Sequence, residues 1–161
     1  MKISVRKVMV CMALAGVSLL SPWIGRVTNA FAAGFSYSSY QQFLDTYVVP
    51  GKYVGDIKIN GVDYDAIQKD RGNPGSLYEK ILQQLVDFNP NKIEGRKNQI
   101  AFWINAYNIG AIKMIMDHYP VDSIRSTTIH WLKNPWNKKI LTIGNTKYSL
   151  DQIEHGILLG A

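Results

Sequence analysis

Hydrophobic residues recur with a helical period in three segments of the chain. Residues 36–48 place apolar side chains at positions i, i+3, i+4 and i+7, the spacing of one helix face. Residues 77–88 repeat this pattern after a capping box, in which Ser76 stands three positions before Glu79. Residues 96–117 form the longest apolar segment. The pattern therefore predicts three helices over these ranges.

Two shorter segments alternate apolar and polar residues, which is the period of a β-strand. In residues 56–64 the pair Asn60-Gly61 is a strong signal for the turn of a hairpin. Residues 140–148 have the same pattern around a turn at 144–145. We therefore expect two small β-hairpins.

A second capping box, formed by Ser149 and Gln152, predicts a helix directly after the second hairpin. Residues 33–161 contain no repeat and no interdomain linker, and they are enough for one domain with a sizeable core. The predicted fold class is α+β, a helix-rich single domain with two small β-hairpins.

The longest predicted helix carries two asparagines in its most apolar part. On a helical wheel Asn105 and Asn108 fall opposite a polar stripe that also holds the small residues Ala106 and Gly110. An amide buried without a hydrogen-bond partner costs about 1–3 kcal/mol, so both side chains should be satisfied. We expect them first to anchor the backbone of a neighbouring segment, and second to line a pocket.

The pocket alternative brings in aromatic neighbours. An asparagine beside Trp103 or Tyr107 would orient a bound ligand or a water molecule. The long connection after this helix adds His130, Trp131 and Trp136 as candidate ligand-binding residues. Tryptophans in a connection have a large area to bury. The connection is therefore either clamped onto the core by its tryptophans or the lip of a binding site.

The last predicted helix holds the candidate catalytic residues. Asp151 stands four positions before His155, with Glu154 beside it, and a carboxylate at this spacing can orient an imidazole as a general base. The structural alternative is a surface ion pair. His118, His130 and His155 lack the spacing of a zinc site, so we expect no metal and no cofactor.

Residues 1–32 have the three parts of a signal peptide. A basic start precedes an apolar stretch at residues 8–20, and Ala-Phe-Ala at residues 30–32 predicts cleavage before Ala33. An uncleaved N-terminal anchor is the alternative. We expect a secreted or periplasmic protein that meets the membrane only through this peptide, if it stays uncleaved.

Cleavage changes the charge of the chain. Four of its 18 basic residues belong to the signal peptide, so 14 remain against 12 acidic residues. No basic surface for nucleic acid is expected from this balance. The single cysteine, Cys11, also leaves, which excludes disulfides and thiol catalysis in the mature chain.

Four blocks of this sequence resemble the DUF547 family, a family of domains of unknown function. The blocks are VDYDAI at residues 62–67, QIAFWINAYNIGAIKMIMDHYPVDSI at 99–124, PW at 135–136 and SLDQIEHGIL at 149–158. The resemblance covers residues 62–161 and implies no established reaction. Members of that family usually continue into a Ser-Cys-Pro block, so we expect residues 33–161 to be an incomplete domain, truncated at its C-terminus.

Three functions remain open from the sequence. The first is a non-enzymatic binding or scaffold module whose partner is an unknown small molecule or protein. The second is a hydrolase- or transferase-type enzyme that uses His155 with Asp151 or Glu154. The third is a truncated, inactive remnant. Of these, the binding module is the expected one.

Overall fold

The computed structural model describes residues 35, 37–54, 56–121 and 134–160. The predicted signal peptide and two candidate ligand-binding residues, His130 and Trp131, lie outside these ranges. The described elements are α1 (Tyr37–Tyr47), β1 (Val48–Val54), β2 (Ile57–Val62), α2 (Tyr64–Asp70), α3 (Leu77–Asp87), the 3-10 turn η2 (Pro90–Lys92), α4 (Arg96–Met116), the 3-10 turn η3 (Pro135–Asn137), β3 (Leu141–Ile143), β4 (Thr146–Tyr148) and the π-helix η4 (Gln152–Leu158).

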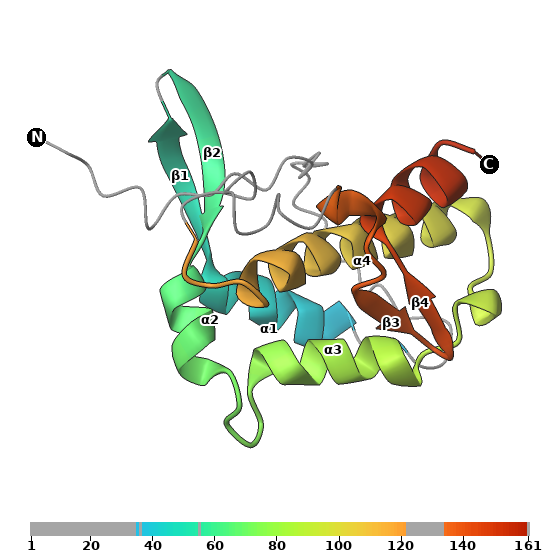
Figure 1. Cartoon of the computed structure of the whole chain (residues 1–161), viewed down its shortest axis with the longest axis horizontal. Helices are drawn as coiled ribbons and strands as arrows, with labels where there is room; N and C mark the ends of the chain where they lie inside the picture. Colours follow the sequence, from blue (N-terminus) through green and yellow to red (C-terminus); the bar gives the residue numbers. More distant parts are fainter. Residues whose placement is uncertain (1–34, 36, 55, 122–133, 161) are drawn as a thin grey trace, which may run out of the picture.

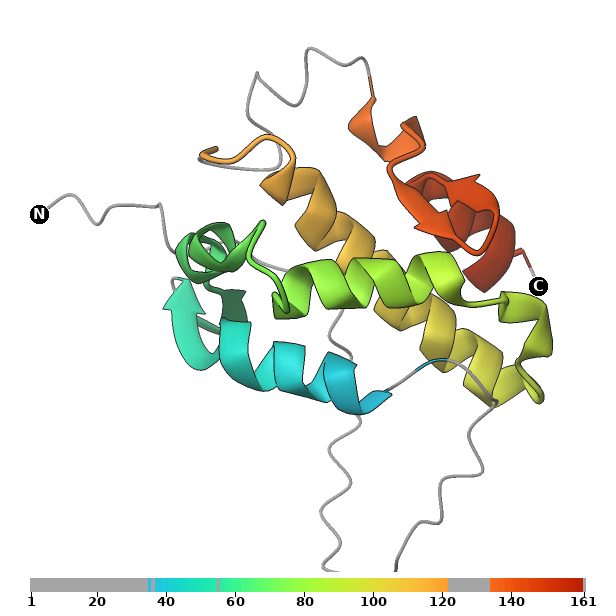
Figure 2. The ribbon, with the colours of Figure 1, turned by 90° about the horizontal axis from the view of Figure 1, so that it is seen from below.

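Helices dominate this architecture, and the two sheets are separate antiparallel hairpins, β1 with β2 and β3 with β4. Helix α4 crosses the molecule, with α1 and α3 along one side and the β3–β4 hairpin and η4 on another (Figures 1 and 2). The predicted α+β class and the two small hairpins are therefore confirmed.

Helix α4 is buried on most of its circumference, because other elements cover it from several directions. Ala106 and Gly110, which the helical wheel placed on a polar stripe, are both buried. Gly110 lets the segment after it in the chain come close: a Cβ there would lie 2.8 Å from Leu150 Cδ2 and 3.4 Å from Leu141 Cδ2. The helical wheel grouped these two residues with the polar side chains. That prediction was wrong, because small residues also occur where another segment packs closely against a helix.

Aromatic rings form the centre of the core. Phe35, Phe88 and Phe102 contact one another with ring centroids 4.9 to 5.7 Å apart. Phe102 also contacts Trp103, which in turn lies edge-to-face with Tyr148 at 5.1 Å. This chain of rings joins the end of α3 and the middle of α4 to the second hairpin.

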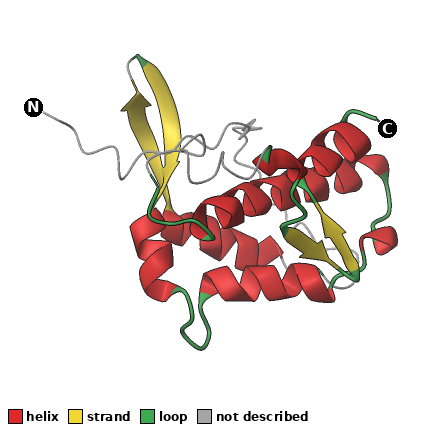
Figure 3. Cartoon of the chain, in the orientation of Figure 1, coloured by secondary structure: helices red, strands yellow, loops and turns green. Residues whose placement is uncertain are grey.

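The first hairpin exists, but its turn is not at Asn60-Gly61. Val48 pairs with Val62 and Val54 with Ile57, so the chain reverses between Val54 and Ile57, and Asn60 and Gly61 both lie inside β2. Residues 50–51 lie inside β1, at an irregularity of the register. Tertiary pairing therefore overrides the local turn signal. The hairpin projects from the helical body (Figure 3).

Local capping signals correctly marked the helix starts. The Ser76 hydroxyl accepts a hydrogen bond from the Glu79 backbone N–H at 3.3 Å. Ser149 and Gln152 form a reciprocal box, with both bonds at 3.1 Å. Helix α2, which the sequence analysis did not predict, starts the same way, because Asp63 accepts from the backbone of the third residue after it. A capping side chain acts within one turn, so it can be read from sequence.

The last helix is wound more widely than an α-helix. The N–H of Leu159 donates to the carbonyl of Glu154 at 2.9 Å, an i to i+5 bond. Within η4, Ile153 is fully buried, and Ile157 and Leu158 pack against the core. The apolar face of this helix is therefore largely covered by the described part of the chain.

Candidate functional site

Asn108 is the predicted site residue with the most unusual surroundings. It is only 4 % exposed, and its Nδ2 has no hydrogen-bond partner within the described residues. The anchor bond that we expected from this nitrogen is thus absent there. Such unsatisfied buried groups are rare, and each requires an explanation.

A small hollow lies against Asn108. We call it the Asn108 hollow, and its lining residues are Tyr40, Leu44, Val48, Asn60, Val62, Asn108 and Ile112. Its volume of about 10 Å³ is that of one water molecule. Helix α1, the base of the first hairpin and α4 supply the walls. The lining residues are apolar except for the tyrosine and the two asparagines, so Asn108 is one of the few polar residues at an otherwise aliphatic space.

The other candidates on α4 lie elsewhere. Asn105 is partly buried, and no hydrogen bond of its side chain occurs among the described residues. Trp103 is 8 % exposed and belongs to the aromatic core. Tyr107 is partly buried and packs against the same core. None of the three lines the Asn108 hollow.

Trp136 lies in the 3-10 turn η3 and is partly buried. It packs against a small buried cluster formed by Met114 of α4 and Leu150. This contact fits the alternative in which the connection is clamped onto the core. It places Trp136 away from the residues that line the Asn108 hollow.

The Asp151–His155 pair forms as the spacing predicts. His155 Nδ1 and Asp151 Oδ1 are 3.1 Å apart, and the two side chains are 64 % and 47 % exposed. Glu154 is partly buried and contributes its backbone carbonyl to the wide turn of η4. A general base must reach the proton of a positioned substrate. The structure brings the pair together at the surface, outside the Asn108 hollow.

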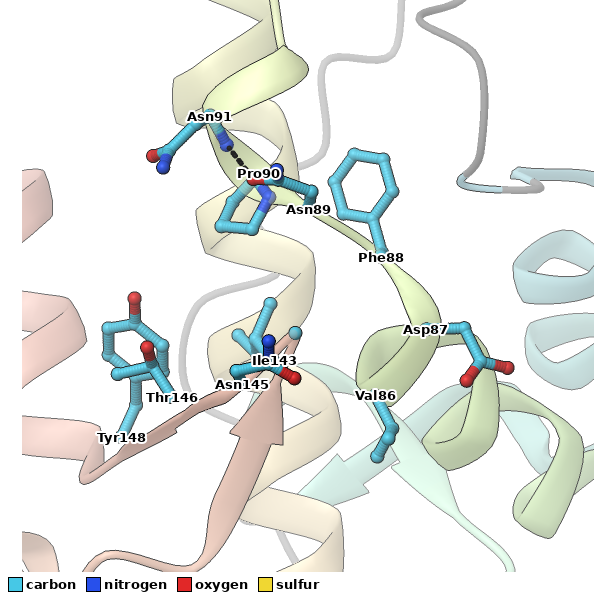
Figure 4. A pocket seen from close by; sticks show the side chains of 11 residues that line it. Val86, Asp87, Phe88, Asn89, Pro90, Asn91, Ile143, Asn145, Thr146 and Tyr148 are labelled. Atoms are coloured by element: carbon cyan, nitrogen blue, oxygen red, sulfur yellow. Dashed lines mark hydrogen bonds between the residues drawn. The ribbon is translucent and has the colours of Figure 1, made fainter.

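A larger hollow, missed by the sequence analysis, lies between the end of α3 and the second hairpin (Figure 4). We call it the polar hollow. Its volume is about 330 Å³, and its lining residues are Val86, Asp87, Phe88, Asn89, Pro90, Asn91, Ile143, Gly144, Asn145, Thr146 and Tyr148. This volume is at the lower end of the range for small-molecule sites.

Two turns build the polar hollow. On one side the Asn89 side chain accepts from the backbone N–H of Asn91 at 3.0 Å and caps η2. On the other side Gly144, at a φ of 57°, turns the β3–β4 hairpin. Both turns were visible in the sequence as breaks between elements. Their meeting was not, because it depends on how α3 packs against β3.

Other site types have little support in the described ranges. No group of three or more His, Cys, Asp or Glu residues is gathered there in a way that would hold a metal ion. In the same part of the chain, no helix combines the length and apolar character needed to cross a bilayer.

The fold and the two hollows define a small helix-rich α+β domain with room for ligands. Residues 90–161 match the family model described as "Protein of unknown function, DUF547". The resemblance inferred from the motifs is therefore confirmed over residues 90–161, whereas the block at residues 62–67 lies outside the matched range. Comparisons with curated proteins and with solved structures gave no match.

Proposed function

We propose that this chain is an exported, non-enzymatic binding module that recognises a carbonyl group through Asn108. The observation that carries the proposal is the buried Nδ2 of Asn108, which lacks a partner in the described residues and belongs to a side chain that lines an apolar hollow. A bound acceptor would supply the missing hydrogen bond. The partner is a small molecule or the end of a protein segment.

The chemistry of the lining limits the ligand. Asn108 offers N–H donors, so the ligand must bring an acceptor. The aliphatic walls formed by Leu44, Val62 and Ile112 favour a small apolar group beside that acceptor. An acyl or peptide-like carbonyl on a short aliphatic group satisfies both conditions. The hollow admits about one water molecule, so it has room for the carbonyl oxygen but not for the whole group.

Stability supports the same proposal. An unpaired buried amide costs about 1–3 kcal/mol, a sizeable part of the roughly 5–15 kcal/mol that stabilises a domain. Sites that violate local packing rules are commonly functional. An asparagine that ties down a neighbouring loop would not bear this cost, because its bond would already be made.

Export is supported by residues 1–32, with their basic start, apolar stretch and Ala-Phe-Ala cleavage sequence. We infer a secreted or periplasmic location. Expression in a bacterial host followed by mass spectrometry of the product tests this: a mature N-terminus at Ala33 is expected. A product that retains Met1 would contradict cleavage.

The ligand proposal is tested by NMR on the purified, ¹⁵N-labelled chain with N-methylacetamide as the carbonyl probe. The Asn108 side-chain resonances are assigned by their loss in Asn108→Leu. We expect a saturable shift of these resonances, and the same shift in the matched variant Asn105→Leu. Unchanged Asn108 resonances, or a contact with a long-lived water that the probe does not displace, would overturn the proposal.

A further inference from the structure

We propose that the polar hollow is a second binding site, and that its ligand is a neutral saccharide. This goes beyond the proposed function, because the polar hollow shares no lining residue with the Asn108 hollow. The argument rests on its charge, its hydrogen-bonding groups, its apolar surfaces and its rigidity.

The charge of the lining argues for a neutral ligand. Among the described residues, no lysine, arginine or histidine lines the polar hollow, so a phosphate or carboxylate would find no cation there. Asp87 is the one ionisable carboxylate in the lining. A lone carboxylate is too little to hold a metal ion, but it is a strong acceptor for a hydroxyl group.

The hydrogen-bonding groups match a polyhydroxylated ligand. Amide side chains of Asn89, Asn91 and Asn145 each carry donors and an acceptor, and Thr146 and Tyr148 add hydroxyls that do both. A sugar hydroxyl likewise donates and accepts. Such a ligand can therefore satisfy these groups in several directions, whereas an aliphatic ligand would leave them unpaired.

Several of these groups remain available within the described part of the chain. Asp87 uses Oδ1 to accept from Gln83, which leaves Oδ2. Asn89 uses Oδ1 for its backbone cap, which leaves its Nδ2 donors. The side chains of Asn91 and Asn145 make no hydrogen bond in that part. Figure 4 shows these residues placed around the hollow on two facing segments.

Apolar surfaces lie among the polar groups. Pro90 and Tyr148 are partly buried and keep some apolar surface, whereas the Phe88 ring is 3 % exposed and belongs to the core. The C–H face of a sugar ring can pack on such surfaces, as apolar groups pack on aromatic rings. Trp103 holds the Tyr148 ring edge-to-face, with an interplanar angle of 64°. The orientation of this ring is thus set by the core before any ligand binds.

The polar hollow is also preformed. The N–H of Gly144 donates to the Leu85 carbonyl at 2.9 Å, which ties the hairpin turn to the end of α3. A Cβ on Gly144 would lie 2.9 Å from the Phe88 carbonyl oxygen, so the two segments are in direct contact. Little conformational entropy of the protein is then lost on binding. A neutral ligand, which makes no ion pair, can therefore still bind with measurable affinity.

The test is an NMR titration of the purified, ¹⁵N-labelled chain with glucose, N-acetylglucosamine, maltose and cellobiose. We expect at least one sugar to shift the resonances of Asn91 and Asn145 saturably. Asn145→Ala should lower the affinity for that sugar by about tenfold, because one or two hydrogen bonds are lost. The matched control Asn137→Ala, at an exposed position outside the hollow, should bind as the natural chain does.

Glucose 6-phosphate distinguishes a neutral site from an anion site. It should bind no more tightly than glucose, because no cation lines the hollow. The proposal is overturned by the absence of saturable shifts with every sugar, by equal affinity in Asn145→Ala, or by tighter binding of the phosphate. Because Asn108 reports on the other hollow, failure here is distinguishable from failure of the proposed function.

Discussion

Tyr47 donates its phenolic hydrogen to Oδ2 of Asp70, 2.5 Å away and 23 positions later in the chain. The same carboxylate oxygen accepts the backbone N–H of Leu77 at 3.1 Å. This one side chain therefore joins α1 to the end of α2 and the start of α3. The Tyr47 hydrogen bond is the main cause that lowers the pKa of Asp70 below its ordinary value of 3.8.

The lowered pKa makes a prediction about acid stability. The ionised Asp70 stabilises the fold above pH 3.8, and this contribution is lost as the pH falls through the depressed pKa. Asp70→Asn should melt several degrees lower at neutral pH, for a loss of about 1–2 kcal/mol. The difference from the natural chain should shrink below pH 3.8. Thermal melts across pH check this, with exposed Asp56→Asn as the control.

Arg71 supports the end of α4. Its Nη1 donates to the Met116 carbonyl at 2.7 Å, and Nη2 lies 3.4 Å from Asp117 Oδ1. Arg71→Lys keeps the charge but loses the forked geometry, so the free energy of unfolding should fall by about 1 kcal/mol. Urea melts measure this. The control is Lys80→Arg on α3. An equal loss in the free energy of unfolding for both variants would contradict a role for the two guanidinium contacts of Arg71.

Alanine substitutions at two glycines distinguish the cost of a positive φ from the cost of a steric contact. Gly144 and Gly72 both have positive φ, at 57° and 83°. A Cβ at Gly144 would meet the Phe88 carbonyl at 2.9 Å, whereas at Gly72 it would meet nothing within 4 Å. Gly144→Ala should therefore destabilise by about 1–3 kcal/mol more than Gly72→Ala. Equal losses in parallel denaturant melts would refute the contact.

Asn108 allows stability to be separated from binding. Asn108→Leu replaces an unpaired amide with an apolar side chain of similar size, so the melting temperature should stay the same or rise by a few degrees. The same variant should no longer bind N-methylacetamide, the carbonyl probe. Asn108→Ala should melt lower than Asn108→Leu, because it enlarges the hollow. A marked drop in Asn108→Leu would show that the amide has a partner.

The exposed pair on η4 tests the enzyme alternative. His155 and Asp151 are both largely solvent-accessible, so His155→Ala should change the free energy of unfolding by less than about 1 kcal/mol. If the surface pair is only structural, binding at either hollow should be unchanged. Loss of a measured hydrolase or transferase activity in His155→Ala, with the fold intact, would revive the catalytic hypothesis.

Local signals explain how much of the fold was predictable. The helix starts at Ser76 and Ser149 follow from side chains that bond within the next turn, and α4 follows from a long apolar run. The turn at Gly144 follows from a residue that tolerates positive φ. Asn60-Gly61 carries an equally strong local signal, yet it lies inside β2, because pairing with β1 decided the register.

The candidate site was predictable only in part, because a site is made by elements that meet from distant parts of the chain. By itself, the sequence determined the resemblance to the DUF547 family, the helices other than α2, the two hairpins, and the presence of a polar residue at Asn108 inside an apolar helix. Only the tertiary structure decided that Asn108 would line a hollow, and that the turns at Asn89 and Gly144 would enclose a second one. Periodicity and capping act over a few residues, whereas packing sets which distant side chains share a space.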